Sequence, residues 1–405
     1  MAVAPANLTL NYPELGTGPI PTDIYHDPDY YARELEAIFR RTWMCAGRVE
    51  QINKVGDFFL KKIPTFDMSI LVVRGKDRKV RAFHNVCQHR GNHLELADNG
   101  NCSVFRCPFH GWAYGLDGRL AGVPDADAFY DLDRGEKALP KVHCELWEGF
   151  IFINLADKPE VTLAEYMGQQ GADLVGYPFH RGIATFEYEG VVNCNWKCMV
   201  DSFCETYHVP VLHKRSVIDT LCGRDNPFGR VIDVRIKGPH RTISVVGNMQ
   251  YQPNPVQGLA FQYAAGPSIT SGSVDEQTQL PKGLNETRAE NWSIDVTVFF
   301  PNWIIVIGSG MYFTHQMWPL GPNQVVWQMR GFMRKAENAA QRFGQENSMV
   351  ELRDAVLEDG NTLERIQHSL RQGLLKEFVF HDHELALRHN YHAVTNWVDD
   401  YETNR

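Results

Sequence analysis

Two short motifs combine cysteine and histidine at a spacing that an ordinary hydrophobic core does not require. Cys87 and His89 are separated by one residue, Cys107 and His110 by two, and seventeen residues lie between the two pairs. Turn-forming residues surround both pairs, so each pair can direct two side chains at one point. Thiolate sulfur and imidazole nitrogen bind zinc and iron in proteins. The four residues are therefore predicted to hold one metal centre.

Two kinds of centre use these four ligands. One is a closed, tetrahedral zinc site, and the other is a Rieske [2Fe–2S] cluster, in which two thiolates bind one iron and two imidazoles the other. A zinc finger groups its cysteines together and its histidines together, whereas each pair here is mixed. The stretches "CQHRG" and "CPFHGW" resemble the ligand loops of Rieske proteins. In these loops Gly91 and Gly111 would let the backbone approach the cluster, and Cys102 is expected to be a free thiol.

A second group of polar residues lies in "DSFCETYHVPVLH", residues 201 to 213. Apolar residues at helical spacing predict a helix here that ends at Pro210, after which the chain turns back to His213. Asp201, Glu205 and His208 share one stripe of this helix. Two histidines and one carboxylate form the facial triad that binds non-haem Fe(II) and leaves positions open for oxygen. The segment is therefore a candidate for a mononuclear iron site.

This segment also resembles the iron-binding segment of the Rieske non-haem iron oxygenases, in their large catalytic (alpha) subunit. The order of parts matches that family along nearly the whole chain: a "DPDYYARELEAIFRRTW" helix, the cluster loops, the "NWK" helix and a mixed α/β region. The resemblance implies a terminal oxygenase. It would use O2 and two external electrons to hydroxylate an aromatic or other hydrophobic molecule at a mononuclear Fe(II).

The resemblance also implies further site residues. The third iron ligand is an aspartate in a later helix, where "AVLEDGNTLERIQ" offers Asp359, with Glu358 as the alternative. Many relatives have an aspartate at the position of Glu205; the glutamate here is similar to that of the relatives that oxidise quaternary amines and of several others. By the resemblance, Glu205 carries electrons between His208 and the cluster residue His110 of the partner subunit. Asp201 is expected to support the iron ligands.

Other functions remain open on the sequence. The main alternative is oxidative demethylation or C–N cleavage of a quaternary amine or betaine. More remote alternatives are a Rieske electron carrier without oxygenase activity and a structural zinc protein. Iron and sulfide content separates these classes, because only the oxygenase needs a mononuclear iron in addition to the cluster.

The sequence contains no G-x-G-x-x-G motif after a strand, so no nicotinamide or flavin domain is expected in this chain. Electrons would come from a separate reductase, directly or through a ferredoxin, with NAD(P)H as the ultimate donor. The resemblance implies a homotrimer in a head-to-tail ring, with or without a small beta subunit.

The overall composition limits the class of protein. The chain has 405 residues, a formal net charge of −9 and 43% hydrophobic residues, and its pI is near 6.0. This charge disfavours nucleic-acid binding. No apolar run reaches the length of a membrane span, and no signal peptide is recognisable. Nine cysteines fit reduced thiols and metal ligands. A cytoplasmic protein is expected.

The pattern of strands and helices predicts an α+β fold. Residues 1–42 form an N-terminal segment and helix that pack with the catalytic domain. Residues 43–157 form an all-β Rieske domain, and residues 158–405 form a catalytic domain with an antiparallel β-sheet and flanking helices. Residues 251–288 show little regular pattern and are a candidate cover for the active site.

Overall fold

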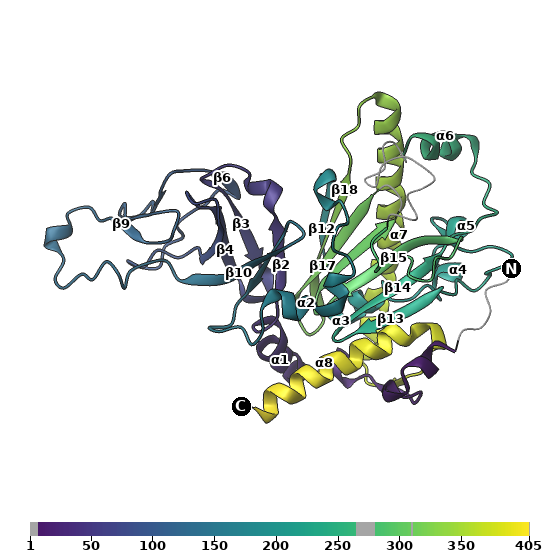
Figure 1. Cartoon of the computed structure of the whole chain (residues 1–405). Coiled ribbons are helices and arrows are strands. Elements are labelled where there is room, and N and C mark those ends of the chain that lie inside the picture. The colour runs from purple at the N-terminus through teal and green to yellow at the C-terminus, as the bar shows by residue number, and fades with distance from the viewer. Residues whose placement is uncertain (1–6, 265–279, 309–310, 405) are drawn as a thin grey trace. The chain divides into compact units, whose positions relative to one another are not determined.

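The computed structural model describes residues 7–264, 280–308 and 311–404, and it forms two compact units (Figure 1). One unit is Phe39–Tyr166, and the other combines Met1–Ile38 with Met167–Arg405. The chain passes from one unit to the other after Ile38, four residues before the boundary expected at 42. It passes back after Tyr166, nine residues beyond the boundary expected at 157. The N-terminal segment therefore shares a unit with the C-terminal half of the chain.

The Phe39–Tyr166 unit is built from β-strands, as its short apolar runs between glycine-rich turns predict. Its main sheet has seven antiparallel strands in the order β2-β11-β10-β5-β4-β3-β6, and a smaller sheet pairs β7, β8 and β9. The strands are β2 Met44–Arg48, β3 Asp57–Ile63, β4 Met68–Arg74, β5 Val80–His84, β6 Asn99–Asn101, β7 Phe105–Arg106, β8 Ala113–Tyr114, β9 Leu120–Gly122, β10 Lys141–Trp147 and β11 Phe150–Asn154.

The other unit contains a second seven-stranded antiparallel sheet, in the order β12-β18-β17-β16-β15-β14-β13. Strands β13 to β18 form a meander, and β12 pairs with β18 at the opposite edge from β13. A two-stranded ladder joins β1 to β19. The strands are β1 Ile20–Pro21, β12 Ile183–Val192, β13 Asp233–Lys237, β14 His240–Val246, β15 Trp292–Phe299, β16 Trp303–Gly308, β17 Tyr312–Gly321, β18 Gln324–Met333 and β19 Glu377–Phe378.

The α-helices gather around this second sheet, and the α+β prediction is confirmed. In the described residues they are α1 Pro28–Glu34, α2 Leu163–Ala172, α3 Trp196–Asp201, α4 Val209–Leu212, α5 Ile218–Leu221, α6 Pro255–Ala264, α7 Ala339–Leu370 and α8 Leu385–Thr403. Asp27 caps α1, since its carboxylate accepts the amide of Asp29 at 2.8 Å. Part of the stretch expected to be irregular, 251–288, thus forms α6, and residues 265–279 lie outside the described residues.

The single helix predicted up to Pro210 is wrong. Helix α3 ends at Asp201, and Pro210 lies in the first turn of the separate helix α4. Proline suits that position because its missing N–H is unneeded in a first helical turn. Tyr207, which continues the apolar spacing beyond the end of α3, is 47% exposed.

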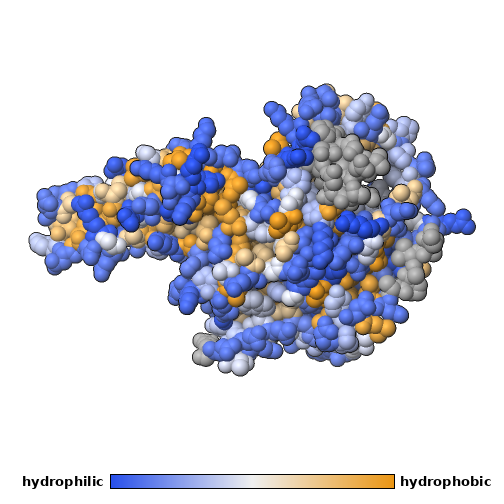
Figure 2. Space-filling view, in the orientation of Figure 1, coloured by the Kyte–Doolittle hydropathy of each residue, from blue (hydrophilic) through white to orange (hydrophobic). Residues whose placement is uncertain are grey.

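The visible surface differs between the units. Figure 2 shows hydrophobic side chains gathered on the Phe39–Tyr166 unit, whereas the visible part of the other unit is mostly polar with scattered apolar residues. The exposed large apolar side chains of the first unit include Leu96, Phe109, Tyr130 and Leu146. Among the helices that the structure describes, none is both long enough and apolar enough to cross a bilayer.

Candidate metal centres

The two Cys–His loops of the first unit have the same backbone pattern. The amide of Gly91 donates to the carbonyl of Cys87 at 3.0 Å, and the amide of Gly111 donates to the carbonyl of Cys107 at 3.0 Å. Both glycines have positive φ, 77° and 73°. A Cβ atom on Gly91 would have nothing within 4 Å. The left-handed turn conformation by itself therefore favours glycine at this position.

The side chains of these loops converge. Cys87 and Cys107 are both buried in one core cluster. The rings of His89 and His110 lie 4.6 Å apart at 77°, and Trp112 stacks on His89 at 4.7 Å. The Nδ1 atom of His89 is buried and has no hydrogen-bond partner among the described residues. Since buried polar atoms are normally paired, an orphaned imidazole nitrogen beside two thiols fits a metal ligand.

A hydrogen bond to sulfur adds Tyr114 to this arrangement, and the spacing of the two motifs does not predict it. The hydroxyl of Tyr114 accepts the amide of Gln88 at 2.9 Å and lies 3.4 Å from the sulfur of Cys87, so its proton is free for the sulfur. Such hydrogen bonds tune the potential of an iron–sulfur cluster. Cys102 packs against the same core, and burial raises the pKa of its thiol to about 11. It therefore stays protonated, as a free thiol would.

The unit that combines Met1–Ile38 with Met167–Arg405, called the catalytic unit below, brings together three of the candidate metal ligands. The Nε2 atoms of His208 and His213 lie 3.1 Å apart. The Oδ1 atom of Asp359 lies 3.5 Å from the first and 3.3 Å from the second. Two ligand atoms that each lie about 2.1 Å from an ion, with a right angle at the ion, are about 3 Å apart. The geometry therefore fits two histidines and one carboxylate on one face of a metal ion.

Two helices position this group. His208 and His213 flank the single turn of α4. Asp359 comes from the long helix α7, whose buried positions include Val356, Asp359 and Leu363. These positions follow the helical period and form one stripe. Asp359 therefore faces the histidines because it lies on the stripe that α7 buries.

The second ring nitrogen of each histidine, Nδ1, contacts a further carboxylate. Glu205 accepts from Nδ1 of His208, and Oε2 of Glu358 lies 2.7 Å from Nδ1 of His213. The hydroxyl of Ser216 also donates to Glu358, at 2.7 Å. A carboxylate on Nδ1 holds the proton there and leaves Nε2 free for a metal. Glu358, the alternative ligand, thus lies behind His213 and outside the triad.

Asp201 does not lie on a stripe with Glu205 and His208, because the helix ends at Asp201. Its carboxylate accepts the hydroxyl of Tyr25 at 2.9 Å and the amide of Asn390 at 2.7 Å. Burial raises the pKa of Asp201 to about 6, with Arg241 opposing the shift. These contacts tie α3 to η3 Asp23–Tyr25 and to α8, so Asp201 supports the fold next to the iron segment.

The chain resembles known protein families over both units. Residues 42–142 match the Rieske [2Fe-2S] domain, and residues 179–400 match the ring hydroxylating alpha subunit (catalytic domain). Benzene 1,2-dioxygenase subunit alpha of Pseudomonas putida is 31% identical over 373 residues, covering 87% of this chain and 80% of that protein. The carnitine monooxygenase oxygenase subunit of Escherichia coli (strain K12) is 31% identical over 213 residues, covering 52% and 56%.

Solved structures show the same fold. A quaternary ammonium Rieske monooxygenase superposes with a TM-score of 0.74 at 18% identity, covering 94% of this chain and 95% of that one. Naphthalene 1,2-dioxygenase from Rhodococcus sp. superposes with a TM-score of 0.72 at 20% identity, covering 94% of each chain. The match to the catalytic-domain family spans more than half of the chain. This chain therefore belongs to the Rieske oxygenase alpha subunits, oxidoreductases with a [2Fe–2S] domain and a non-haem iron catalytic domain that use O2.

Proposed function

We propose that this chain is the terminal oxygenase component of a system that hydroxylates an aromatic or other hydrophobic small molecule. The observation that carries the proposal is the group formed by His208, His213 and Asp359, whose ligand atoms all lie within 4.8 Å of one another. The same chain carries the two Cys–His loops of a Rieske domain. A facial triad that is supplied by a one-electron donor suits the activation of O2.

The proposed ligands divide between two centres. Cys87, His89, Cys107 and His110 would hold the [2Fe–2S] cluster, and His208, His213 and Asp359 would hold the mononuclear iron. When bound, the cluster supplies electrons one at a time and the iron offers open positions for O2. The residues around the iron ligands keep a proton on Nδ1 of each histidine, so that both Nε2 atoms face the metal.

We further propose that electrons cross between subunits through Glu205. Its carboxylate accepts from Nδ1 of His208, one of the proposed iron ligands, and the residue is 9% exposed. It would join His208 to His110 of the partner subunit in a homotrimer. The solved structure of a quaternary ammonium Rieske monooxygenase gives insights into inter-subunit electron transfer in that protein. A separate reductase, directly or through a ferredoxin, would reduce the cluster.

A second candidate function is oxidation of a quaternary amine at a methyl or C–N bond. The relatives include a carnitine monooxygenase subunit and a choline monooxygenase. In addition, a pocket of about 720 Å³ is lined by Leu221 at the end of α5, the helix that follows His213. Its described lining residues include the carboxylates of Asp225 and Glu290 and no lysine or arginine. Such a lining favours a cationic guest over an anionic one.

A single-turnover experiment tests both candidates. Holoenzyme reduced chemically in advance would meet O2 with toluene, naphthalene, choline and carnitine, each supplied separately, and products would be identified by mass. Oxygen added to a ring compound supports hydroxylation, and loss of a methyl group or C–N cleavage supports the second candidate. Metal analysis should give roughly three irons and two sulfides per chain. Purified protein with only a cluster, or with zinc alone, would contradict the oxygenase proposal.

A further inference from the structure

The surface around the proposed cluster ligands carries exposed aromatic side chains. Phe109 directly precedes His110 and is 56% exposed, and the two ring centres lie 3.8 Å apart. The ring of Phe129 packs edge-on against that of His89 at 5.8 Å, and the neighbouring Tyr130 is 97% exposed. Exposed aromatic side chains that gather in one place are typical of contact surfaces between proteins. This end of the first unit is therefore a candidate docking surface.

Phe129 and Tyr130 belong to a strongly acidic loop, residues 125–136, which we call the acidic loop. It contains five carboxylates and one arginine, Arg134. Its exposed carboxylate side chains are those of Asp125, Asp127, Asp131, Asp133 and Glu136. Among the described residues these side chains form no ion pair, and their one hydrogen bond is from the amide of Gly135 to Asp133, at 2.7 Å. Unpaired negative charge next to the cluster ligands therefore faces solvent.

The segment that carries the iron ligands has the opposite charge on its surface. Lys214 and Arg215 directly follow His213, and both are exposed. In the part of the chain that the structure describes, neither cation has an ion pair or a side-chain hydrogen bond. In the same segment Tyr207 is 47% exposed and Val211 is 72% exposed. This surface therefore combines two unpaired positive charges with exposed apolar side chains.

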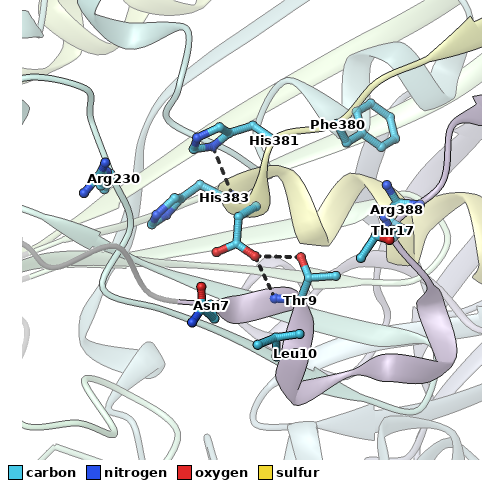
Figure 3. Close-up of a pocket in the computed structure, with 10 residues that line it drawn as sticks. Asn7, Thr9, Leu10, Thr17, Arg230, Phe380, His381, His383 and Arg388 are labelled. Atoms are coloured by element: carbon cyan, nitrogen blue, oxygen red, sulfur yellow. Dashed lines mark hydrogen bonds between the residues drawn. The ribbon is translucent and has the colours of Figure 1, made fainter.

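The exposed ring of Tyr207 is already ordered in the single chain. It stacks on the ring of His381 at 4.7 Å and 4°. Figure 3 shows His381 on the turn that leads into α8, where it lines a pocket of about 350 Å³. A side chain that is held in place loses little conformational freedom when a partner binds it. Tyr207 is therefore a preformed contact point directly before the iron ligand His208.

We propose that the acidic loop of one copy of this chain docks against Lys214 and Arg215 of a second copy. This inference rests on the proposed function, in which Glu205 joins His208 to His110 of the partner subunit. That route brings the surface around the cluster of one copy next to the surface around the iron of the other. Opposite charges that are unpaired in the single chain then meet around a centre of exposed aromatic side chains. The charges thus select the copy and its orientation.

Charge reversal in the holoenzyme tests this docking. The loop variant combines Asp127→Lys, Asp133→Lys and Glu136→Lys, which changes the formal charge of the acidic loop from −4 to +2. It leaves Asp125 and Asp131 in place, because their positive φ of 50° and 55° disfavours lysine. The turn variant combines Lys214→Glu and Arg215→Glu.

Each variant alone places like charges opposite each other. We therefore expect each to raise the protein concentration at half assembly roughly tenfold or more at low ionic strength. The combined variant, with all five changes, restores opposite signs and should return to within about threefold of the parent. Sedimentation velocity over a range of protein concentrations measures assembly in all of them.

Lys335→Glu with Asp400→Lys is the matched control, since both side chains are exposed and belong to neither surface; it should leave assembly unchanged. Parental assembly in the loop and turn variants would overturn the proposal, and so would a combined variant that fails to restore it. A loop variant that assembles like the parent but takes electrons more slowly from the reductase would assign the acidic loop to the electron donor instead. Iron and sulfide content should stay parental throughout, so that loss of docking is distinguished from failure of the proposed function.

Discussion

The cluster loops and the iron triad differ in how the chain builds them. The four proposed cluster ligands lie at positions 87 to 110, on two loops with the same hydrogen-bond pattern. The triad instead combines a single helical turn with Asp359, about 150 residues further along the chain. Local turns are sufficient to form the first group, whereas the second exists only once α7 packs in the catalytic unit. A change at the triad should therefore disturb the iron and leave the cluster intact.

The largest expected effect is that of His213→Ala. This change removes a ligand whose Nε2 lies 3.3 Å from Asp359, so we expect loss of the mononuclear iron and at least a roughly thousandfold loss of turnover. The visible absorption of the cluster should be unchanged, because its ligands lie in the other unit. Metal analysis with absorption spectroscopy checks both. Loss of both centres together would show that the two sites do not fold independently.

Glu205→Gln should come next in size. The amide retains the shape of the carboxylate but not its charge, so both metals should remain bound while coupled turnover falls about a hundredfold or more. Rapid mixing of reduced enzyme with substrate and O2 measures electron transfer directly. Product formation at the parental rate would refute a role for Glu205 between His208 and the partner subunit's His110.

Glu358→Gln tests whether the carboxylate behind His213 matters as much as the one behind His208. Loss of the 2.7 Å contact with Nδ1 weakens the hold on the imidazole, and iron affinity should fall about 10- to 100-fold. Competition with a chelator measures that affinity. Glu364→Gln is a control, because Glu364 is on the same helix and bonds to Asn193 instead. Equal loss in both variants would indicate a general effect on α7.

Asp201→Asn should give the smallest effect, on stability and its pH dependence. The pKa of the buried carboxyl is raised to about 6, so the folded state holds a proton that the unfolded chain has released. This contribution to stability is present below about pH 4 and is lost as the pH rises through 6. Relative to the parent, the variant should gain about 2 kcal/mol between pH 4 and pH 7. Urea unfolding at several pH values measures this; a constant difference would contradict it.

The contrast between the two centres also explains what the sequence could predict. Cys87 and His110 belong to motifs whose spacing alone directs side chains at one point. The family resemblance favours Asp359 over Glu358, and the spacing of Val356 and Leu363 on α7 favours the same residue. Residues three or four apart on a helix share one face, and Asp359 lies three residues after Val356 and four before Leu363. The helical period alone therefore places Asp359, and not Glu358, on the face that these apolar residues bury.

Other features depended on tertiary contacts. The break after Asp201 could not be read from the apolar spacing, because the residues up to Tyr207 keep a helical period although the chain turns. The contact of Tyr114 with Cys87 joins β8 to a loop 27 residues away. Contacts between residues distant in sequence follow from strand pairing and packing, which composition and spacing do not encode.

The triad also acts on the chain between its ligands. An ion held by His208 and Asp359 would be a cross-link that closes a loop of about 150 residues, which includes most strands of the catalytic sheet. In a chain-entropy treatment, a link of that span removes about 5 kcal/mol of freedom from the unfolded state. Iron would then stabilise the fold as well as take part in the reaction. Protein stripped of iron should unfold and be cleaved by proteases more readily within this loop, even in the absence of O2 and substrate.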